Sequence, residues 1–308
     1  MTKAIAFPEY GGADVLRPID VELPAPGPGQ VLVEVRAAGF NPLDHKLRSG
    51  AVREFFPVAL PAVPGFEVAG VVAAVGADVT AWAPGDEVFG ALMGGGHAER
   101  ALVEAALLAR KPASLDWAQA AAIPVAAETS ERALDVLGVR AGETLLVHGA
   151  AGGVGTLLLQ FARARGIAVI GTAGPANHAY LAELGAVPVA YGEGLAERVR
   201  ALAPGGVDRV LDLAGLGGVL PLSVELAGSA ERVLTIADFA GAAEHGVRIT
   251  TGDEGVPYHQ RAYAAALALH EAGTLRLPLH RVLPLAEAAE AHRISEQGHL
   301  RGKIVLTV

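Results

Sequence analysis

Cysteine is absent from this chain of 308 residues. A chain without thiols forms no disulfides, has no cysteine nucleophile and offers zinc no thiolate ligand. An excess of basic residues is also lacking, because 24 Lys and Arg face 33 Asp and Glu and the net charge is −9. An acidic surface repels phosphate backbones, so the composition argues against a nucleic-acid-binding protein.

Long apolar runs are missing too. The richest one, "AQAAAIPVAAE", is short and is interrupted by Pro124, whereas a membrane-spanning helix needs about 20 apolar residues. The N-terminal "MTKAIAFPEYGG" reaches proline and glutamate too early for the apolar core of a signal peptide. With 52% hydrophobic residues, the chain can bury a large core. We therefore expect a cytoplasmic enzyme for small molecules, with no nucleic-acid or membrane partner.

The first part of the chain, to about Ala113, predicts a β-rich domain. Short apolar stretches such as "VLVEVRAAGF" (31–40) and "EVAGVVAAVG" (67–76) are separated by Pro/Gly turns such as "PAPGPG". Valine occupies every second position from 31 to 35, which is the period of a strand with one buried face. Repeated short strands with dense turns indicate an irregular β-barrel or sandwich.

From Gly142 to about Thr251, strand-like and helical runs alternate. Strands are expected at 144–148, 167–172, 187–190, 207–212 and 231–236. Crossover helices are expected at 154–165, 177–184, 195–202 and 217–226. This alternation predicts a doubly wound parallel sheet of the α/β class. The last part, from about 253, predicts two helices, at 258–273 and 285–297, and a final strand "GKIVLTV".

The stretch "TLLVHGAAGGVGTLLLQFARARG" has the pattern of a strand, a glycine-rich turn and a helix. It fits the dinucleotide fingerprint G-x-G-x-x-G with Ala150 in the first slot, Gly152 in the second and Gly155 in the third. Alanine fits the first slot if its φ stays negative, Gly152 admits a pyrophosphate to the backbone, and Gly155 lets the helix pack closely. The N–H groups of Gly153 and Val154, where the helix begins, would face the phosphates. The alternative is a glycine-rich turn without a ligand.

The end of the next strand indicates which dinucleotide binds. NAD sites usually place Asp or Glu there for the ribose 2′-hydroxyl, but here Thr172 and "AGP" occupy the position. Without a carboxylate to repel it, a 2′-phosphate can enter, so NADPH is expected over NADH. His178 and Tyr191 are its candidate partners, although an ordinary place in a surface helix is an equal interpretation of His178. Thr235, near the end of a later strand, completes the candidate cofactor contacts.

Motifs along the whole chain resemble the zinc-independent quinone oxidoreductase branch of the medium-chain dehydrogenase/reductase superfamily. They are "FPEYGGADVL", "AAGFNPLDHKLRSG", "VPGFEVAGVVAAVG", "WAPGDEVFG", "VHGAAGGVG", "GVDRVLDLAG" and "HLRGKIVLTV". The resemblance implies a GroES-like catalytic domain (1–115), a Rossmann-type NADPH-binding domain (116–252) and a C-terminal segment (253–308) that returns to the first domain. It also implies an active site in the cleft between domains and a homodimer joined through sheet edges of the cofactor domains.

The zinc ligands of related enzymes are replaced in this chain. Zinc-dependent relatives carry a cysteine where Asn41 stands and a G-H-E motif in which Phe66 stands for the histidine. Of the polar residues in these two motifs only Asp44 and Glu67 remain, and a lone glutamate does not hold a catalytic zinc. We therefore predict no metal. The alternative is a replacement site built from His45, Glu67 and His97.

Three residues are candidates for the catalytic site. The Asn41 amide can donate a hydrogen bond to a substrate carbonyl, although a turn-forming asparagine is an equal interpretation. Asp44 either belongs to the site or fixes its loop. Thr129 matches a threonine that lies near the nicotinamide in the family, but Glu128 before it and Glu131 after it depart from the family pattern.

Two further charged residues receive structural interpretations. Asp212 is expected to order a loop near the cofactor, and Lys303 is expected in a solvated basic turn. The resulting hypothesis is an NADPH-dependent reductase of quinones or α,β-unsaturated carbonyl compounds. The alternative is a non-catalytic NADPH-binding or redox-sensing protein of the same fold.

Overall fold

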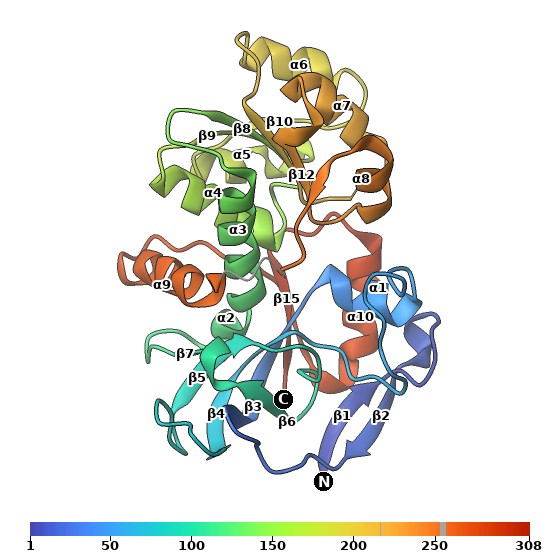
Figure 1. The fold of residues 1–308 in the computed structure, drawn as a ribbon, viewed down its shortest axis with the longest axis vertical. Helices are drawn as coiled ribbons and strands as arrows, with labels where there is room; N and C mark the ends of the chain where they lie inside the picture. Colours follow the sequence, from blue (N-terminus) through green and yellow to red (C-terminus); the bar gives the residue numbers. More distant parts are fainter. Residues whose placement is uncertain (216, 253–256) are drawn as a thin grey trace. The chain divides into compact units, whose positions relative to one another are not determined.

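The computed structural model describes residues 1–215, 217–252 and 257–308 (Figure 1). The chain divides into two compact units. Unit 1 comprises Met1–Val125 and Leu277–Val308, and unit 2 comprises Ala126–Arg276. The units thus divide at other positions than the boundaries placed at 115 and 252 from the sequence. Among the described helices, none combines the length and the apolar character that crossing a bilayer requires.

Unit 1 is built on a seven-stranded sheet of order β14-β15-β3-β4-β5-β7, in which β6 also pairs with β3. The strands are β3 (Gln30–Phe40), β4 (Glu67–Val75), β5 (Glu87–Ala91), β6 (Arg100–Glu104), β7 (Leu108–Arg110), β14 (Leu279–Pro284) and β15 (Lys303–Thr307). A separate pair is formed by β1 (Thr2–Ala6) and β2 (Arg17–Val21). The predicted β-rich domain is confirmed.

Strand β3 organises this sheet. It pairs with β4 over most of its length and with β6 in its first half, and its last residues pair with β15, where Ile304 lies opposite Phe40. The alternating valines Val31, Val33 and Val35 are buried in the core, as their spacing predicted. The helices of this part are α1 (Pro42–Ser49), α2 (Trp117–Ala121), α10 (Ala288–Gln297) and the start of α3 (Pro124–Leu137).

Unit 2 contains a six-stranded parallel sheet of order β10-β9-β8-β11-β12-β13. The strands are β8 (Thr144–His148), β9 (Ala168–Thr172), β10 (Val187–Val189), β11 (Arg209–Asp212), β12 (Val233–Thr235) and β13 (Arg248–Ile249). The predicted doubly wound sheet is confirmed. The two-residue strand β13 was not expected, because so short a run carries no periodicity.

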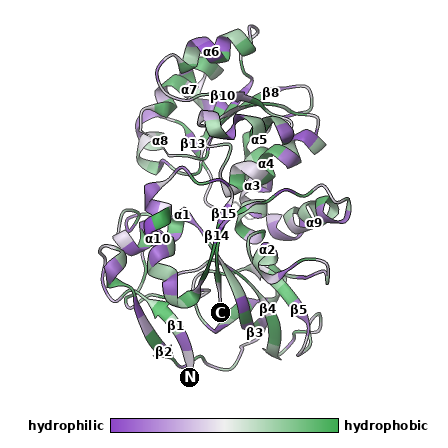
Figure 2. Ribbon diagram, turned by 180° about the vertical axis from the view of Figure 1, so that it is seen from behind, coloured by the Kyte–Doolittle hydropathy of each residue, from purple (hydrophilic) through white to green (hydrophobic). Residues whose placement is uncertain are grey.

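The strands are connected by the helices α4 (Gly153–Ala164), α5 (His178–Glu183), α6 (Leu195–Leu202), α7 (Val219–Ala227) and α8 (Phe239–His245). Helix α9 (Tyr258–Glu271) follows the last strand. Hydrophobic and hydrophilic residues both occur along α6 (Figure 2), whose buried side packs into the core of the unit. Short 3-10 turns occur at Ala13–Val15, Ala105–Leu107, Pro175–Asn177, Ala230–Arg232 and Leu285–Glu287.

The strand order of unit 2 locates a ligand position. The chain runs from β8 outward through β9 and β10, and then returns to the other side of β8 with β11. The order therefore reverses between β8 and β11. In open α/β sheets, ligands bind outside the carboxyl ends of the strands at such a reversal.

Candidate functional site

The glycine turn follows β8, and its conformation explains the alanine in the first fingerprint slot. Gly149 adopts the left-handed conformation, with φ +74°. Ala150 is not among the residues with positive φ, so it carries a side chain without strain. A β-carbon on Gly155 would lie 2.5 Å from the carbonyl oxygen of Ala150, which is backbone and cannot give way easily. Gly155 is therefore required for packing between the helix and the turn.

Gly152 is different, because the protein itself leaves room for a side chain there. A β-carbon on Gly152 would contact only the Gly149 carbonyl oxygen, at the ordinary distance of 3.5 Å. Gly152 precedes the first residue of α4, and residues 152–154 are all partly exposed. The first N–H groups of a helix have no partner within the helix and attract anions. The turn therefore fits a pyrophosphate.

Thr172 braces this turn from the neighbouring strand. Its buried hydroxyl accepts a hydrogen bond from the Gly149 N–H at 3.3 Å, and its carbonyl accepts one from the Ala150 N–H at 3.2 Å. The Thr172 hydroxyl thus helps to hold the conformation of the glycine turn. Beyond the strand, a His178 ring nitrogen lies 3.2 Å from the Ala173 carbonyl oxygen. Tyr191 is exposed, and its hydroxyl lies 3.7 Å from the point where a β-carbon of Gly174 would stand.

Three polar side chains end the adjacent strands β8, β11 and β12. Asp212 lies beside His148 on one side and Thr235 on the other. Asp212 accepts hydrogen bonds from the Thr235 hydroxyl at 2.8 Å and from the Ala214 N–H at 2.9 Å. Thr235 and Asp212 thus hold the loops that leave the sheet, which is the role expected for Asp212.

His148 was not singled out from the sequence. One of its ring nitrogens lies 3.0 Å from the Ser223 hydroxyl, which in turn donates to the Val219 carbonyl at 2.7 Å. Burial lowers the pKa of His148 to about 4, although the nearby Asp212 opposes the shift. The imidazole is therefore neutral at pH 7.

Helix α3 accommodates the unusual charges around Thr129 by pairing them. Arg132 donates to both carboxylate oxygens of Glu128, at 2.7 Å and 3.1 Å, and also to the Thr250 hydroxyl at 2.6 Å. The Thr129 hydroxyl lies at the edge of this buried group, 3.4 Å from a Glu128 oxygen. Glu131 forms ion pairs with Arg165 and Arg261. The departures from the family pattern are thus matched by cations in the same unit.

A second polar group lies in unit 1, at the ends of β3, β4 and β15. The Nδ2 of Asn41 donates to Glu67 Oε1 at 2.9 Å, and the Lys303 ammonium donates to Glu67 Oε1 and to Asn41 Oδ1, both at 2.5 Å. The other Glu67 oxygen accepts from the Val125 N–H at 2.8 Å. All three side chains are buried.

The sequence-based interpretation of Lys303 as a solvated turn residue is wrong. Only 5% of Lys303 is exposed to solvent, and its ammonium group forms an ion pair with Glu67. The sequence did contain a signal. Glu67 begins the apolar strand "EVAGVVAAV", and a buried carboxylate requires a hydrogen-bonded cationic partner. The sequence alone did not identify which lysine or arginine is that partner.

Asp44 fastens the loop that carries Asn41. Its two oxygens accept hydrogen bonds from the Asn41 N–H at 2.7 Å and the Gly65 N–H at 2.8 Å. Burial raises the pKa of Asp44, while His97 and these N–H groups act in the opposite direction. The geometry gives Asp44 the loop-fixing role considered from the sequence.

The residues of the alternative metal site, His45, Glu67 and His97, each make other contacts. His45 Nδ1 lies 3.0 Å from the Ser295 hydroxyl, and both Glu67 oxygens accept hydrogen bonds from the protein. His97 stacks on Phe40. Across residues 1–215, 217–252 and 257–308, no three His, Cys, Asp or Glu side chains are grouped so that they could hold a metal ion. Asn41 and Phe66, at the positions of zinc ligands in relatives, do not supply the missing donors.

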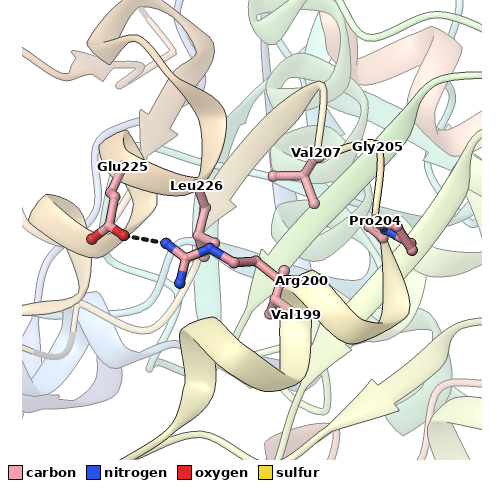
Figure 3. A pocket seen from close by; sticks show the side chains of 9 residues that line it. Val199, Arg200, Pro204, Gly205, Val207, Glu225 and Leu226 are labelled. Carbon is pink, nitrogen blue, oxygen red and sulfur yellow. Dashed lines mark hydrogen bonds and ion pairs between the residues drawn. The ribbon is translucent and has the colours of Figure 1, made fainter.

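A cavity of about 280 Å³ also lies in unit 2, between α6, the turn at 203–207 and α7 (Figure 3). The ion pair between Arg200 and Glu225 borders it. Neither the glycine turn nor the residues that end β8, β11 and β12 line this cavity, so we do not assign it to the cofactor.

Comparisons with known proteins agree with this geometry. Family models described as "Alcohol dehydrogenase GroES-like domain" and "Zinc-binding dehydrogenase" match residues 27–113 and 184–306. The chain is 34% identical to the quinone oxidoreductase of Homo sapiens over 327 aligned positions, covering 99% of this chain and 98% of that protein.

Two solved structures have the same fold over their whole length. One is the quinone oxidoreductase from Coxiella burnetii, with a TM-score of 0.85, 32% identity and coverage of 100% and 99% of the two chains. The other is a mycobacterial protein complexed with NADPH, with a TM-score of 0.84, 30% identity and full coverage of both chains. The chain therefore belongs to the quinone oxidoreductase branch of the medium-chain dehydrogenase/reductase superfamily.

Proposed function

We propose that this protein is an NADPH-dependent oxidoreductase that reduces quinones or α,β-unsaturated carbonyl compounds. The observation that carries the proposal is the open backbone at Gly152, in front of the first turn of α4. A dinucleotide pyrophosphate is the ligand that this arrangement suits best. The similar mycobacterial structure complexed with NADPH supports the same cofactor.

The preference for NADPH rests on the end of β9. No carboxylate occupies residues 172–175, so a 2′-phosphate meets no like charge from that stretch. His178 and the exposed Tyr191 are the side chains that would hold it. We expect kcat/KM for NADPH to exceed that for NADH, and equal or reversed values would contradict the assignment.

The substrate side of the proposal rests on Asn41. NADPH, when bound, supplies the hydride. As negative charge develops on a carbonyl oxygen of the substrate, the Asn41 amide would donate a hydrogen bond to that oxygen. Asp44, Glu67 and Lys303 hold the amide and its loop. Because quinone reduction can take its protons from water, the proposal requires no protein acid.

The test is oxidation of NADPH by a simple quinone and by a panel of enones. The loss of NADPH absorbance is measured with and without a chelator. Turnover should persist in the chelator. A strict requirement for added zinc would contradict the proposal, because neither Asn41 nor Phe66 replaces the missing ligands.

A non-catalytic NADPH-binding or redox-sensing protein remains the second candidate. The unusual charges around Thr129 are the reason to consider this candidate. The ion pair between Glu128 and Arg132 accounts for part of that pattern. Tight NADPH binding without turnover over the whole panel would favour this candidate, and measurable turnover would remove it.

We also infer a homodimer, joined through the sheet edge of unit 2. The edge strand β13 ends in Ile249, whose side chain is exposed, and unpaired edges favour pairing with another chain. Light scattering should give twice the chain mass of 31.4 kDa. A monomer mass that persists at high protein concentration would contradict the inference.

A further inference from the structure

The ammonium group of Lys303 has as many acceptors as it has hydrogens. Its Nζ lies 2.9 Å from the Phe40 carbonyl oxygen, 2.5 Å from Asn41 Oδ1 and 2.5 Å from Glu67 Oε1. An ammonium carries three hydrogens, so each is used within the protein. Lys303 therefore has no hydrogen left to give to a substrate in this arrangement.

The same contacts fix the orientation of the Asn41 amide. A cation faces its oxygen, and a carboxylate faces its nitrogen. The flipped amide would place its NH₂ group against the ammonium and its oxygen against the Glu67 carboxylate. Both contacts would be repulsive in a buried site, where charges are weakly screened. Lys303 and Glu67 together thus enforce one of the two orientations.

This orientation leaves one donor available. The Asn41 NH₂ group has two hydrogens, and within the described part of the chain Glu67 is its acceptor. The second hydrogen is the one that can meet a substrate oxygen. Its direction is set by the planar amide, and the amide is set by the ion pair.

We propose that Lys303 is a positioning residue for the reduction reaction, which acts by locking the Asn41 amide so that its second N–H is presented to the substrate carbonyl. The inference rests on the function proposed above. It also defines the substrate group, namely a neutral carbonyl oxygen on which charge develops during hydride transfer to a conjugated system.

The principal test replaces both partners, Lys303→Met with Glu67→Gln, so that no unpaired charge is left buried. A glutamine can pair with Asn41 in either amide orientation, so the lock is removed while hydrogen bonding is retained. We expect kcat with a simple quinone to fall roughly tenfold to hundredfold, because an ordered hydrogen-bond donor is lost. The Kd for NADPH, set by the turn in unit 2, should stay unchanged.

A mutant cycle separates positioning from simple structural damage. Asn41→Ala is measured alone and together with the paired replacement. If Lys303 acts through Asn41, the paired replacement should change kcat/KM less than about twofold in the Asn41→Ala background. Additive losses in an active enzyme would overturn the inference for Lys303 alone. A wild-type protein without turnover would instead remove the proposed function.

A second lysine in unit 1 provides the matched control. The Lys111 side chain is also 5% exposed, and its Nζ lies 2.9 Å from Glu87 Oε2 and near the carbonyl oxygens of Pro112 and Leu115. It makes no contact with Asn41. Lys111→Met with Glu87→Gln removes an ion pair that a buried lysine makes with the half-exposed Glu87, and kcat should remain within about twofold of the wild-type value.

A further measurement does not depend on turnover. It follows the side-chain amide signal of Asn41 in ¹⁵N NMR, which is assigned by its loss in Asn41→Ala. This signal should shift in Lys303→Met/Glu67→Gln and stay in place in Lys111→Met/Glu87→Gln. A signal that does not move in the first variant would overturn the inference.

Discussion

The two units hold their polar groups in opposite ways. In unit 2, the fingerprint glycines lie in one continuous stretch, Gly149 to Gly155, which runs from the end of β8 into the first turn of α4. In unit 1, the group around Asn41 joins residues up to 262 positions apart. A local site can be recognised by its spacing, whereas a site assembled by a sheet depends on which strands become neighbours.

The units also differ in how well their buried polar atoms are satisfied. Among the described residues, the buried side-chain atoms without a hydrogen-bond partner are Arg48 Nε, His97 Nδ1 and both ring nitrogens of His292. All belong to unit 1. The Phe40 ring packs against the rings of both His97 and His292, at centroid distances of 5.8 Å and 4.8 Å. Unit 1 therefore contains buried imidazoles whose charged form is disfavoured by burial, although Asp44 and Glu67 oppose this effect at His97, which predicts a difference in acid stability.

The largest expected effect is loss of stability in acid, and it should begin in unit 1. Burial lowers the pKa of His45 to about 4 and that of His292 to about 2, and it also lowers the pKa of His97. These histidines are neutral in the folded protein but gain protons when unfolded below about pH 6.5. Stability is therefore complete above that pH and falls below it, by about 1.4 kcal/mol per pH unit for each histidine.

Urea unfolding at pH 7, 6 and 5 measures this effect, and hydrogen exchange read by peptide assigns it to a unit. Unit 2 has two such histidines, His148 and His259, against the three named in unit 1. Its protection against hydrogen exchange should therefore be lost at a lower pH than that of unit 1. The raised pKa of Asp44 acts in the opposite direction, because the folded protein takes up this proton at a higher pH than the unfolded chain does. A stability independent of pH from 7 to 5 would contradict the prediction.

The next largest effect compares the buried ion pairs of the two units. Lys303→Met leaves the fully buried Glu67 without its cation, and Arg132→Met does the same to Glu128, whose side chain is 10% exposed. Breaking a buried pair costs about 3–5 kcal/mol. We expect the upper end for Lys303→Met and a smaller loss for Arg132→Met.

Chemical denaturation of both variants gives these values. Adding Glu67→Gln or Glu128→Gln to the respective variant should recover most of the loss, because the unpaired charge is then removed. If the paired variants are no more stable than the single ones, the loss comes from packing, and the comparison of the ion pairs fails.

The same contrast shows how much could be predicted from the sequence. Strand β8, the turn and α4 follow from local periodicity and glycine spacing, and the alternating sheet of unit 2 follows from repetition of that pattern. Lys303 could not be placed, because a lysine before a final strand has the same local appearance in a solvated turn and in a buried pair. Only the pairing of β15 with β3 brings it to Asn41. Glu128 departs from the family pattern, and the helical spacing of α3 pairs it with Arg132, four residues further along the chain.

Within the glycine turn, Gly155→Ala should mainly destabilise the fold. The added β-carbon would lie 2.5 Å from the Ala150 carbonyl oxygen, so the turn or the helix must shift. Overpacking of this kind costs about 1–3 kcal/mol, which exceeds the helix-forming advantage of alanine of about 1 kcal/mol. The melting temperature should fall with or without NADPH. An unchanged melting temperature would show that the turn adjusts without cost.

The smallest effect on stability, but a selective one on binding, is expected for Gly152→Ala. Gly152 has φ −70°, which alanine adopts readily, and its β-carbon would meet only one atom, at 3.5 Å. The melting temperature should therefore stay near that of the wild type. If the pyrophosphate approaches the backbone here, the methyl group should weaken or remove a charge-assisted hydrogen bond, and the Kd for NADPH should rise roughly tenfold or more. Isothermal titration of the two alanine variants side by side gives the comparison. If Gly155 serves the fold and Gly152 serves the ligand, only Gly152→Ala should lose affinity, and wild-type affinity in Gly152→Ala would contradict the inference on which the cofactor assignment rests.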